Sequence, residues 1–145
     1  KGVRITIACL LLVGTTDLLT NRLIKEIVAR PRPCSLRDQS AGEYSWLRIP
    51  DGARGGYGFP SSHAVNNFAA VFFFVILFPR NKRIWWLFFP AVIVALSRVY
   101  LGLHYPSDVL AGMIIGACFG IGGGMLVRKF ERHFNALHLQ TDRRT

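Results

Sequence analysis

The sequence predicts an all-α fold, a polytopic bundle of transmembrane helices that forms a single domain over residues 1–145. Two observations carry this prediction: 51% of the residues are hydrophobic, and most of them gather in four long apolar runs. The 18 Lys and Arg against 8 Asp and Glu leave a net charge of +10. A disordered basic tail and a soluble nucleic-acid-binding module would both lack such runs, so both classes are excluded and no nucleic-acid partner is expected.

The four runs approach the length that crosses a bilayer, whose hydrocarbon core of about 30 Å needs roughly 20 helical residues. In chain order they cover residues 3–24, 63–78, 84–101 and 106–127. The second run is short, and Pro90 predicts a kink in the third. Asp17 in the first run, and Asn66 and Asn67 in the second, should face other helices or water because unpaired polar groups are costly in lipid.

Glycines recur at every fourth position of the last run, at Gly112, Gly116, Gly120 and Gly124. This spacing places them on one helical face, where bare backbone lets another helix approach closely. Packing within the bundle is preferred to dimerisation as the purpose of this face.

The basic residues near the ends of the runs predict how the chain crosses the membrane. One side collects Lys1, Arg4, Arg80, Lys82, Arg83, Arg128, Lys129 and Arg132. Because cytoplasmic segments carry an excess of Lys and Arg, this side is predicted to be cytoplasmic, together with the tail over residues 128–145. The tail is either an amphipathic helix on the inner surface or a solvated segment. Residues 25–60 and 102–105 then share the opposite side, which is the periplasm in a bacterial inner membrane.

On that opposite side the topology collects three clusters of unusual polar residues. They read Lys25-x6-Arg32-Pro33, Pro60-Ser61-Ser62-His63 and Ser97-Arg98-x5-His104-x3-Asp108. Taken singly, a basic residue at a span end is more often a snorkelling anchor, and a serine before a helix is more often only a cap. The convergence of all three clusters on one side predicts a functional site.

The cationic and hydroxyl residues of the clusters suit a phosphate group. Lys25, Arg32 and Arg98 would place three cations near one point, and arginine binds phosphate oxygens in a bidentate manner. Ser61 and Ser62 stand where an N-cap is expected before the second run, and the free N–H groups of a helix's first turn attract anions. These five residues form the predicted phosphate-binding set.

The remaining three residues predict a phosphoryl transfer. Pro106 suits the first turn of a helix, which puts His104 just outside that helix and Asp108 within reach of the imidazole. An aspartate that orients a histidine leaves the other ring nitrogen free to attack or to accept a proton. His63, on another helix, would be the second proton carrier.

The order and spacing of the clusters resemble the signatures of the phosphatidic acid phosphatase type 2 superfamily of membrane lipid phosphatases, which read Lys-x6-Arg-Pro, Pro-Ser-Gly-His and Ser-Arg-x5-His-x3-Asp. The one departure is Ser62, where the signature has glycine. The resemblance implies that His104 forms a phosphohistidine, that Asp108 orients it, and that His63 protonates the leaving group and then activates water. It also implies six spans, two of them before Lys1, and no metal or other cofactor.

The resemblance further implies a substrate in the bilayer, a lipid phosphate or diphosphate hydrolysed at the periplasmic face. Lipid A 1-phosphate and undecaprenyl diphosphate are favoured over phosphatidylglycerol phosphate and phosphatidic acid because the outer segment is compact and rich in arginine. The alternative is a non-catalytic protein that binds or transports anionic lipids, which would need the cations but no paired histidines. A vanadate-dependent haloperoxidase would share the phosphate-site signatures, but four apolar runs argue against such a soluble enzyme.

The segment over residues 34–59 allows two interpretations. Its aromatic residues Tyr44, Trp46 and Tyr57 could lie at headgroup level and control lipid access, or the segment could be an ordinary connection. A second phosphate or a sugar headgroup could be contacted by Arg30, Arg37, Arg48 and Arg54.

Overall fold

The structure of this chain, a computed structural model, describes residues 2–36 and 56–142, with side chains over 2–35 and 56–134. Helix α1 (Gly2–Leu19) runs on through a π-helical turn (Thr20–Ile24) into α2 (Lys25–Val28), and the short α3 (Pro33–Leu36) follows. Next come α4 (Ser62–Leu77), a 3₁₀ segment (Lys82–Leu87), α5 (Phe88–Tyr100) and α6 (Pro106–Asp142). Within these ranges the regular structure is helical, which confirms the all-α prediction.

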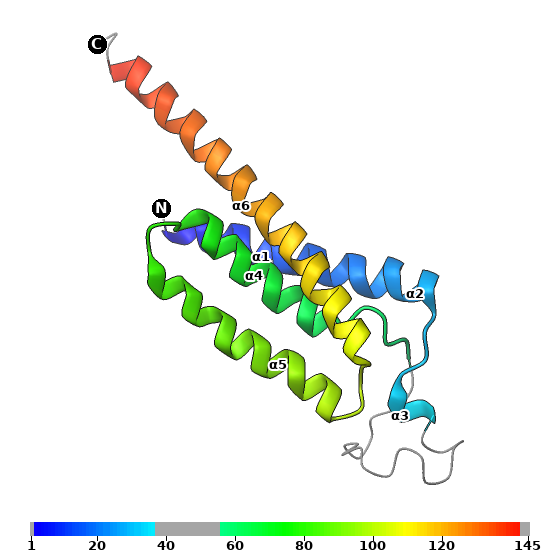
Figure 1. Cartoon of the computed structure of the whole chain (residues 1–145). Helices are drawn as coiled ribbons and strands as arrows, with labels where there is room; N and C mark the ends of the chain where they lie inside the picture. Colours follow the sequence, from blue (N-terminus) through cyan, green and yellow to red (C-terminus); the bar gives the residue numbers. More distant parts are fainter. Residues whose placement is uncertain (1, 37–55, 143–145) are drawn as a thin grey trace.

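Three helical stretches are long and apolar enough to cross a membrane, namely Gly2–Val28, Lys82–Tyr100 and Pro106–Phe134. The second predicted run forms α4, which has 16 residues and contacts α1, α5 and α6 (Figure 1). Its residues Ala64, Val65 and Ala69 are wholly buried. The first, third and fourth predicted runs are therefore candidate spans, and the second run is a shorter helix at the centre of the bundle.

The third run, in which Pro90 predicts a kink, divides into two kinds of helix. Pro90 lies in the first turn of α5, directly after the 3₁₀ segment (Lys82–Leu87). Proline is tolerated in the first turn because the N–H groups there have no partner within the helix. The predicted irregularity is therefore a change from 3₁₀ to α-helix at the start of α5.

The glycine face of α6 packs directly onto the backbone of α4. A Cβ added at Gly112 would lie 2.8 Å from the Ser61 carbonyl oxygen, and Gly116 sits as closely over the carbonyl of Val65. The prediction that this face packs within the bundle is confirmed. The same close approach lets the Ser61 N–H donate to the Asp108 carbonyl oxygen at 3.1 Å, which joins the start of α4 to the start of α6.

Backbone hydrogen bonds also join the segment that leaves α2 to the two other segments that carry the predicted clusters. The Gly58 N–H donates to the Arg30 carbonyl at 2.7 Å, just before α4 begins. The Cys34 N–H donates to the Gly102 carbonyl at 2.9 Å, in the turn between α5 and α6. These bonds hold the three clusters against one another at one end of the bundle.

Candidate active site

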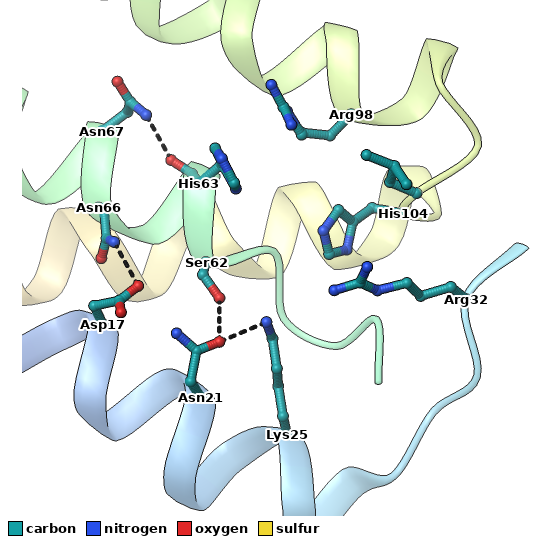
Figure 2. Close-up of a pocket in the computed structure, with 11 residues that line it drawn as sticks. Asp17, Asn21, Lys25, Arg32, Ser62, His63, Asn66, Asn67, Arg98 and His104 are labelled. Atoms are coloured by element: carbon teal, nitrogen blue, oxygen red, sulfur yellow. Dashed lines mark hydrogen bonds between the residues drawn. The ribbon is translucent and has the colours of Figure 1, made fainter. Parts of the chain in front are cut away.

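A cavity of about 380 Å³ opens where α1, α2, α4 and α5 meet the turn before α6 (Figure 2). It is lined by Asp17, Asn21, Lys25, Arg32, Ser62, His63, Asn66, Asn67, Arg98, Leu103 and His104. Six of the eight site residues predicted from the sequence are in this lining, and they come from all three clusters. The two others, Ser61 and Asp108, are buried behind the cavity wall.

Three cationic side chains face the cavity. Lys25 Nζ donates to the Asn21 Oδ1 at 2.6 Å, and Arg32 Nε reaches the Tyr57 carbonyl at 3.4 Å. Arg98 Nε is buried and has no hydrogen-bond partner among the described residues. Asp17 is the one carboxylate in the described lining, so the cations outnumber it and the cavity suits an anion.

His104 projects from the turn before α6 into the cavity and is only 4% exposed. Its Nδ1 lies 2.7 Å from the Gly58 carbonyl oxygen. A carbonyl oxygen can only accept a hydrogen bond, so Nδ1 carries the proton and Nε2 keeps its lone pair. This tautomer leaves Nε2 able to act as a nucleophile.

The surroundings of His104 also keep the ring neutral. Burial, together with the nearby charges of Arg32 and Lys25, lowers the pKa of His104 from its ordinary 6.5 to about 4. The hydrogen bond with the Gly58 carbonyl acts in the opposite direction but does not offset the burial. A neutral imidazole with a free Nε2 is therefore present at pH 7.

Asp108 does not make the direct hydrogen bond to His104 that the sequence predicts. Its Oδ2 lies 3.9 Å from Nδ1 of that histidine and accepts the Tyr105 N–H at 2.8 Å instead. Its Oδ1 accepts from Arg30 at 2.8 Å. The physical reason is the backbone pairing of Arg30 with Gly58, which brings the Gly58 carbonyl to the imidazole and Arg30 to the carboxylate. Asp108 thus fixes the turn that carries His104.

The start of α4 contributes His63 and the two serines. His63 is in the first turn and lines the cavity, and the Ser62 hydroxyl donates to the Asn21 Oδ1 at 2.9 Å. Ser61 occupies the N-cap position, but its hydroxyl makes no capping bond and has no partner in the described part of the chain. The structure therefore brings Ser62 to the cavity and leaves the Ser61 side chain outside it.

The cavity is also lined by four polar residues that were not predicted as site residues from the sequence, namely Asp17, Asn21, Asn66 and Asn67. Asp17, Asn21 and Lys25 are four residues apart along one continuous helix, so they share a face. That spacing was the signal that could have found them. The expectation that Asp17, Asn66 and Asn67 face other helices or water is confirmed, since all three line the cavity and Asn66 Nδ2 donates to Asp17 Oδ1 at 2.9 Å.

Arg30 and Gly58 shape the site from outside the cavity. Arg30 donates to Ser107 and to Asp108, each at 2.8 Å, and its guanidinium lies 4.2 Å from the centre of the Tyr105 ring. In the structure the Arg30 guanidinium is engaged in this ion pair, and its suggested contact with a second phosphate or a sugar stays a prediction. The other arginines of that suggestion, and Tyr44 and Trp46, lie outside the described residues.

Over residues 2–36 and 56–142, no three His, Cys, Asp or Glu residues gather in a way that could hold a metal ion. The cavity lining itself presents three cations, the hydroxyl of Ser62 and two histidines.

Comparison with known proteins gives a consistent result. Residues 5–132 match the PAP2 superfamily. The chain is 35% identical over 137 residues to a lipid A 4'-phosphatase of Bacteroides thetaiotaomicron, and this match covers 94% of this chain and 57% of the relative. It is 36% identical over 106 residues to a lipid A 1-phosphatase of Rhizobium johnstonii, and this match covers 73% of this chain and 41% of the relative.

A solved structure is similar to the whole bundle. The crystal structure of a transmembrane PAP2 type phosphatidylglycerolphosphate phosphatase from Bacillus subtilis superposes with a TM-score of 0.56 at 28% identity. The match covers 88% of this chain and 59% of that chain. The chain thus spans about half the length of the proteins that it resembles.

Proposed function

The chain belongs to the PAP2 superfamily, and from this premise we propose that it removes phosphate from a membrane lipid phosphate or diphosphate through a phosphohistidine at His104. One observation carries the proposal. A buried, neutral imidazole, with its Nδ1 proton held by the Gly58 carbonyl, faces a cavity lined by three cations. A site of this kind joins a nucleophile to groups that stabilise a phosphoryl group.

In the first step Nε2 of His104 attacks phosphorus, and the bond from phosphorus to the lipid oxygen breaks. Protonated His63 gives its proton to that oxygen, so the lipid leaves as an alcohol or as a phosphate. The positive charge that the imidazole ring gains is stabilised by the Nδ1–H bond to the Gly58 carbonyl. Lys25, Arg32 and Arg98, with Ser62, hold the oxygens of the phosphoryl group as their charge shifts.

In the second step neutral His63 takes a proton from water, and the resulting hydroxide oxygen attacks phosphorus. The bond between nitrogen and phosphorus breaks, inorganic phosphate leaves, and His104 returns to its neutral form. Asp108 has a positioning role in both steps, because it holds the Tyr105 N–H and Arg30 and so fixes the turn that carries the nucleophile.

We further propose that the reaction takes place at the periplasmic face of a bacterial inner membrane. The cavity lies at one end of the bundle. Arg4 lies near the start of α1, Arg80 follows the end of α4, and Arg128 of α6 donates to the Ile76 carbonyl at 3.2 Å near that same end of α4. An excess of positive charge marks the cytoplasmic side. We propose a lipid A phosphate as the substrate, because two similar proteins are named as lipid A phosphatases, one for the 4'-phosphate and one for the 1-phosphate. The sequence favours lipid A 1-phosphate or undecaprenyl diphosphate, and the similar crystal structure is of a phosphatidylglycerolphosphate phosphatase.

The test is phosphate release in detergent with EDTA present. The substrates are lipid A, undecaprenyl diphosphate, phosphatidylglycerol phosphate and phosphatidic acid, and the parent protein is compared with His104→Ala. His133→Ala is the matched control, because His133 is exposed on α6 and far along that helix from the cavity. We expect the parent protein to release phosphate and EDTA to leave that release unchanged. The substitution His104→Ala should abolish release, and His133→Ala should leave it at the level of the parent.

Either of two results would overturn the proposal. One is a folded His104→Ala protein that still releases phosphate, which would exclude the phosphohistidine. The other is a folded parent protein that releases phosphate from none of the four lipids, which would favour the non-catalytic binder of anionic lipids.

A further inference from the structure

The cavity has a second end that the phosphoryl chemistry does not use. Asp17 lies eight residues before Lys25 on the same continuous helix, about 12 Å along its axis. Asn66 and Asn67 lie one turn beyond Ser62 and His63 on α4. Figure 2 shows Asp17 and Asn66 on the side of the cavity away from Arg32 and His104. We call Asp17, Asn66 and Asn67 the polar end.

The hydrogen bonds of the polar end leave some of its capacity open. Asn66 donates to Asp17 Oδ1 and accepts from the Thr16 hydroxyl, both at 2.9 Å, and Asn67 donates to the His63 carbonyl at 2.8 Å. Asp17 Oδ2 and Asn67 Oδ1 accept no hydrogen bond from the described residues, although both side chains line the cavity. Unsatisfied acceptors in an apolar helix are costly unless a ligand or water donates to them.

The polarity along the helices that line the cavity changes in three layers, of which the last lies outside the cavity lining. Lys25 and His63 form the first layer, the polar end forms the second, and the next turns toward the opposite membrane side are apolar, as at Leu10 and Phe74. A phosphorylated sugar that carries acyl chains has the same order of charge, hydroxyl groups and hydrocarbon. A prenyl diphosphate would instead place a second anion or an isoprenoid chain against a carboxylate and two amides, which is unfavourable.

We infer that the polar end is a specificity subsite for hydroxyl or amide groups of a sugar that carries the scissile phosphate. The open acceptors of Asp17 and Asn67 would accept hydrogen bonds from the sugar, and the Asn66 amide fixes the carboxylate for that purpose. The inference rests on the proposed phosphatase function and names the substrate class within it. It predicts that glycosyl phosphate lipids are hydrolysed in preference to prenyl diphosphates.

The test is the ratio of kcat/KM for lipid A to kcat/KM for undecaprenyl diphosphate. We expect the parent to favour lipid A, and Asp17→Asn and Asn67→Ala each to lower the ratio by about tenfold, the usual effect of losing a buried hydrogen bond. Asn81→Ala is the matched amide control, because Asn81 is exposed before the 3₁₀ segment and should leave the ratio unchanged. Asn67→Ala is the safer variant for folding, since the Asn67 side chain bonds only to the backbone of its own helix.

A second measurement does not depend on turnover of a lipid. Glucosamine 1-phosphate should inhibit the parent more strongly than inorganic phosphate does, and Asn67→Ala should remove this advantage while inhibition by inorganic phosphate persists. An unchanged ratio in both variants, or a parent that favours undecaprenyl diphosphate, would overturn the inference and leave the phosphatase proposal standing. A parent that hydrolyses neither of these two lipids but does hydrolyse phosphatidylglycerol phosphate or phosphatidic acid would also overturn the inference alone. A parent that hydrolyses none of the four lipids would instead overturn the phosphatase proposal itself.

Discussion

The protonation of His104 gives the sharpest test of the site, and the perturbation is acidification. The ordinary pKa of a histidine is 6.5, whereas burial lowers that of His104 to about 4. At pH 6.5 about half of an ordinary histidine would be protonated, but only about 0.3% of His104 would be. Nδ1 should carry the single proton of the neutral ring, because its neighbour is the Gly58 carbonyl.

The assay is nitrogen NMR of the protein in detergent with ¹⁵N-labelled histidine. The chain contains 4 histidines, and the variant His104→Gln assigns the resonances of His104. We expect one ring to remain in the Nδ1–H form from neutral pH down to about pH 5 and to titrate near 4.

The same shift has a consequence for stability. The folded protein binds the proton of His104 less well than the unfolded chain does, so protonation favours unfolding. The contribution of this residue is therefore fully present above pH 6.5 and is lost as the pH falls through about 4. A titration near 6.5, or a ring that carries its proton on Nε2, would refute both the burial argument and the assignment of Nε2 as nucleophile.

Three further predictions concern residues around the cavity and the helix packing. Gly58→Ala would bring a Cβ to 3.1 Å from Asp108 Oδ2. The value of kcat should therefore fall at least tenfold, while the inhibition constant of inorganic phosphate stays within about threefold of that of the parent. An equal loss of turnover and of phosphate inhibition would show a collapsed site instead. Arg30→Ala leaves the buried Asp108 carboxylate without its ion-pair partner, so thermal unfolding in detergent should show a loss of about 1–3 kcal/mol that Arg30→Lys partly restores. Gly116→Ala should destabilise the protein by a similar amount, because the added methyl group would overpack against α4. Gly122→Ala is the control and should not destabilise it, because a Cβ at Gly122 meets open space. Matching melting temperatures for the two variants would contradict the packing described for α6.

The sequence predicts the helices and the meeting of the clusters because both depend on short-range periodicity. The glycines from Gly112 to Gly124 recur with the helical repeat, and that repeat alone determines the face that packs on α4. Polar side chains at the ends of apolar runs must gather at a membrane face, so Lys25, His63 and His104 could be placed on one side without knowledge of the packing.

The partners of individual atoms could not be predicted in the same way. Asp108 and His104 are four residues apart, which favours a contact, yet the imidazole bonds to Gly58, which is 46 residues away in sequence. Its position follows from the pairing of Gly58 with Arg30 across the segment between α2 and α4. No local pattern encodes that pairing, since a backbone carbonyl has no residue signature. The Ser61 hydroxyl faces away from the cavity for a similar tertiary reason, the close packing of α6 against the start of α4.

The serine at position 62, where the family signature has glycine, fits this geometry without disturbing it. The Ser62 hydroxyl donates to Asn21 Oδ1, and the same oxygen accepts from Lys25 Nζ. Asn21 therefore links α4 to the helix that carries Lys25 and limits the positions that the ammonium group can take. A glycine at position 62 would free one lone pair of the Asn21 oxygen and loosen this link, so the extra hydroxyl contributes to the orientation of Lys25, a cation that we propose binds phosphate. The substitution Ser62→Gly should accordingly weaken inhibition by inorganic phosphate less than Lys25→Ala does, and Asn21→Ala should remove the difference between serine and glycine at position 62.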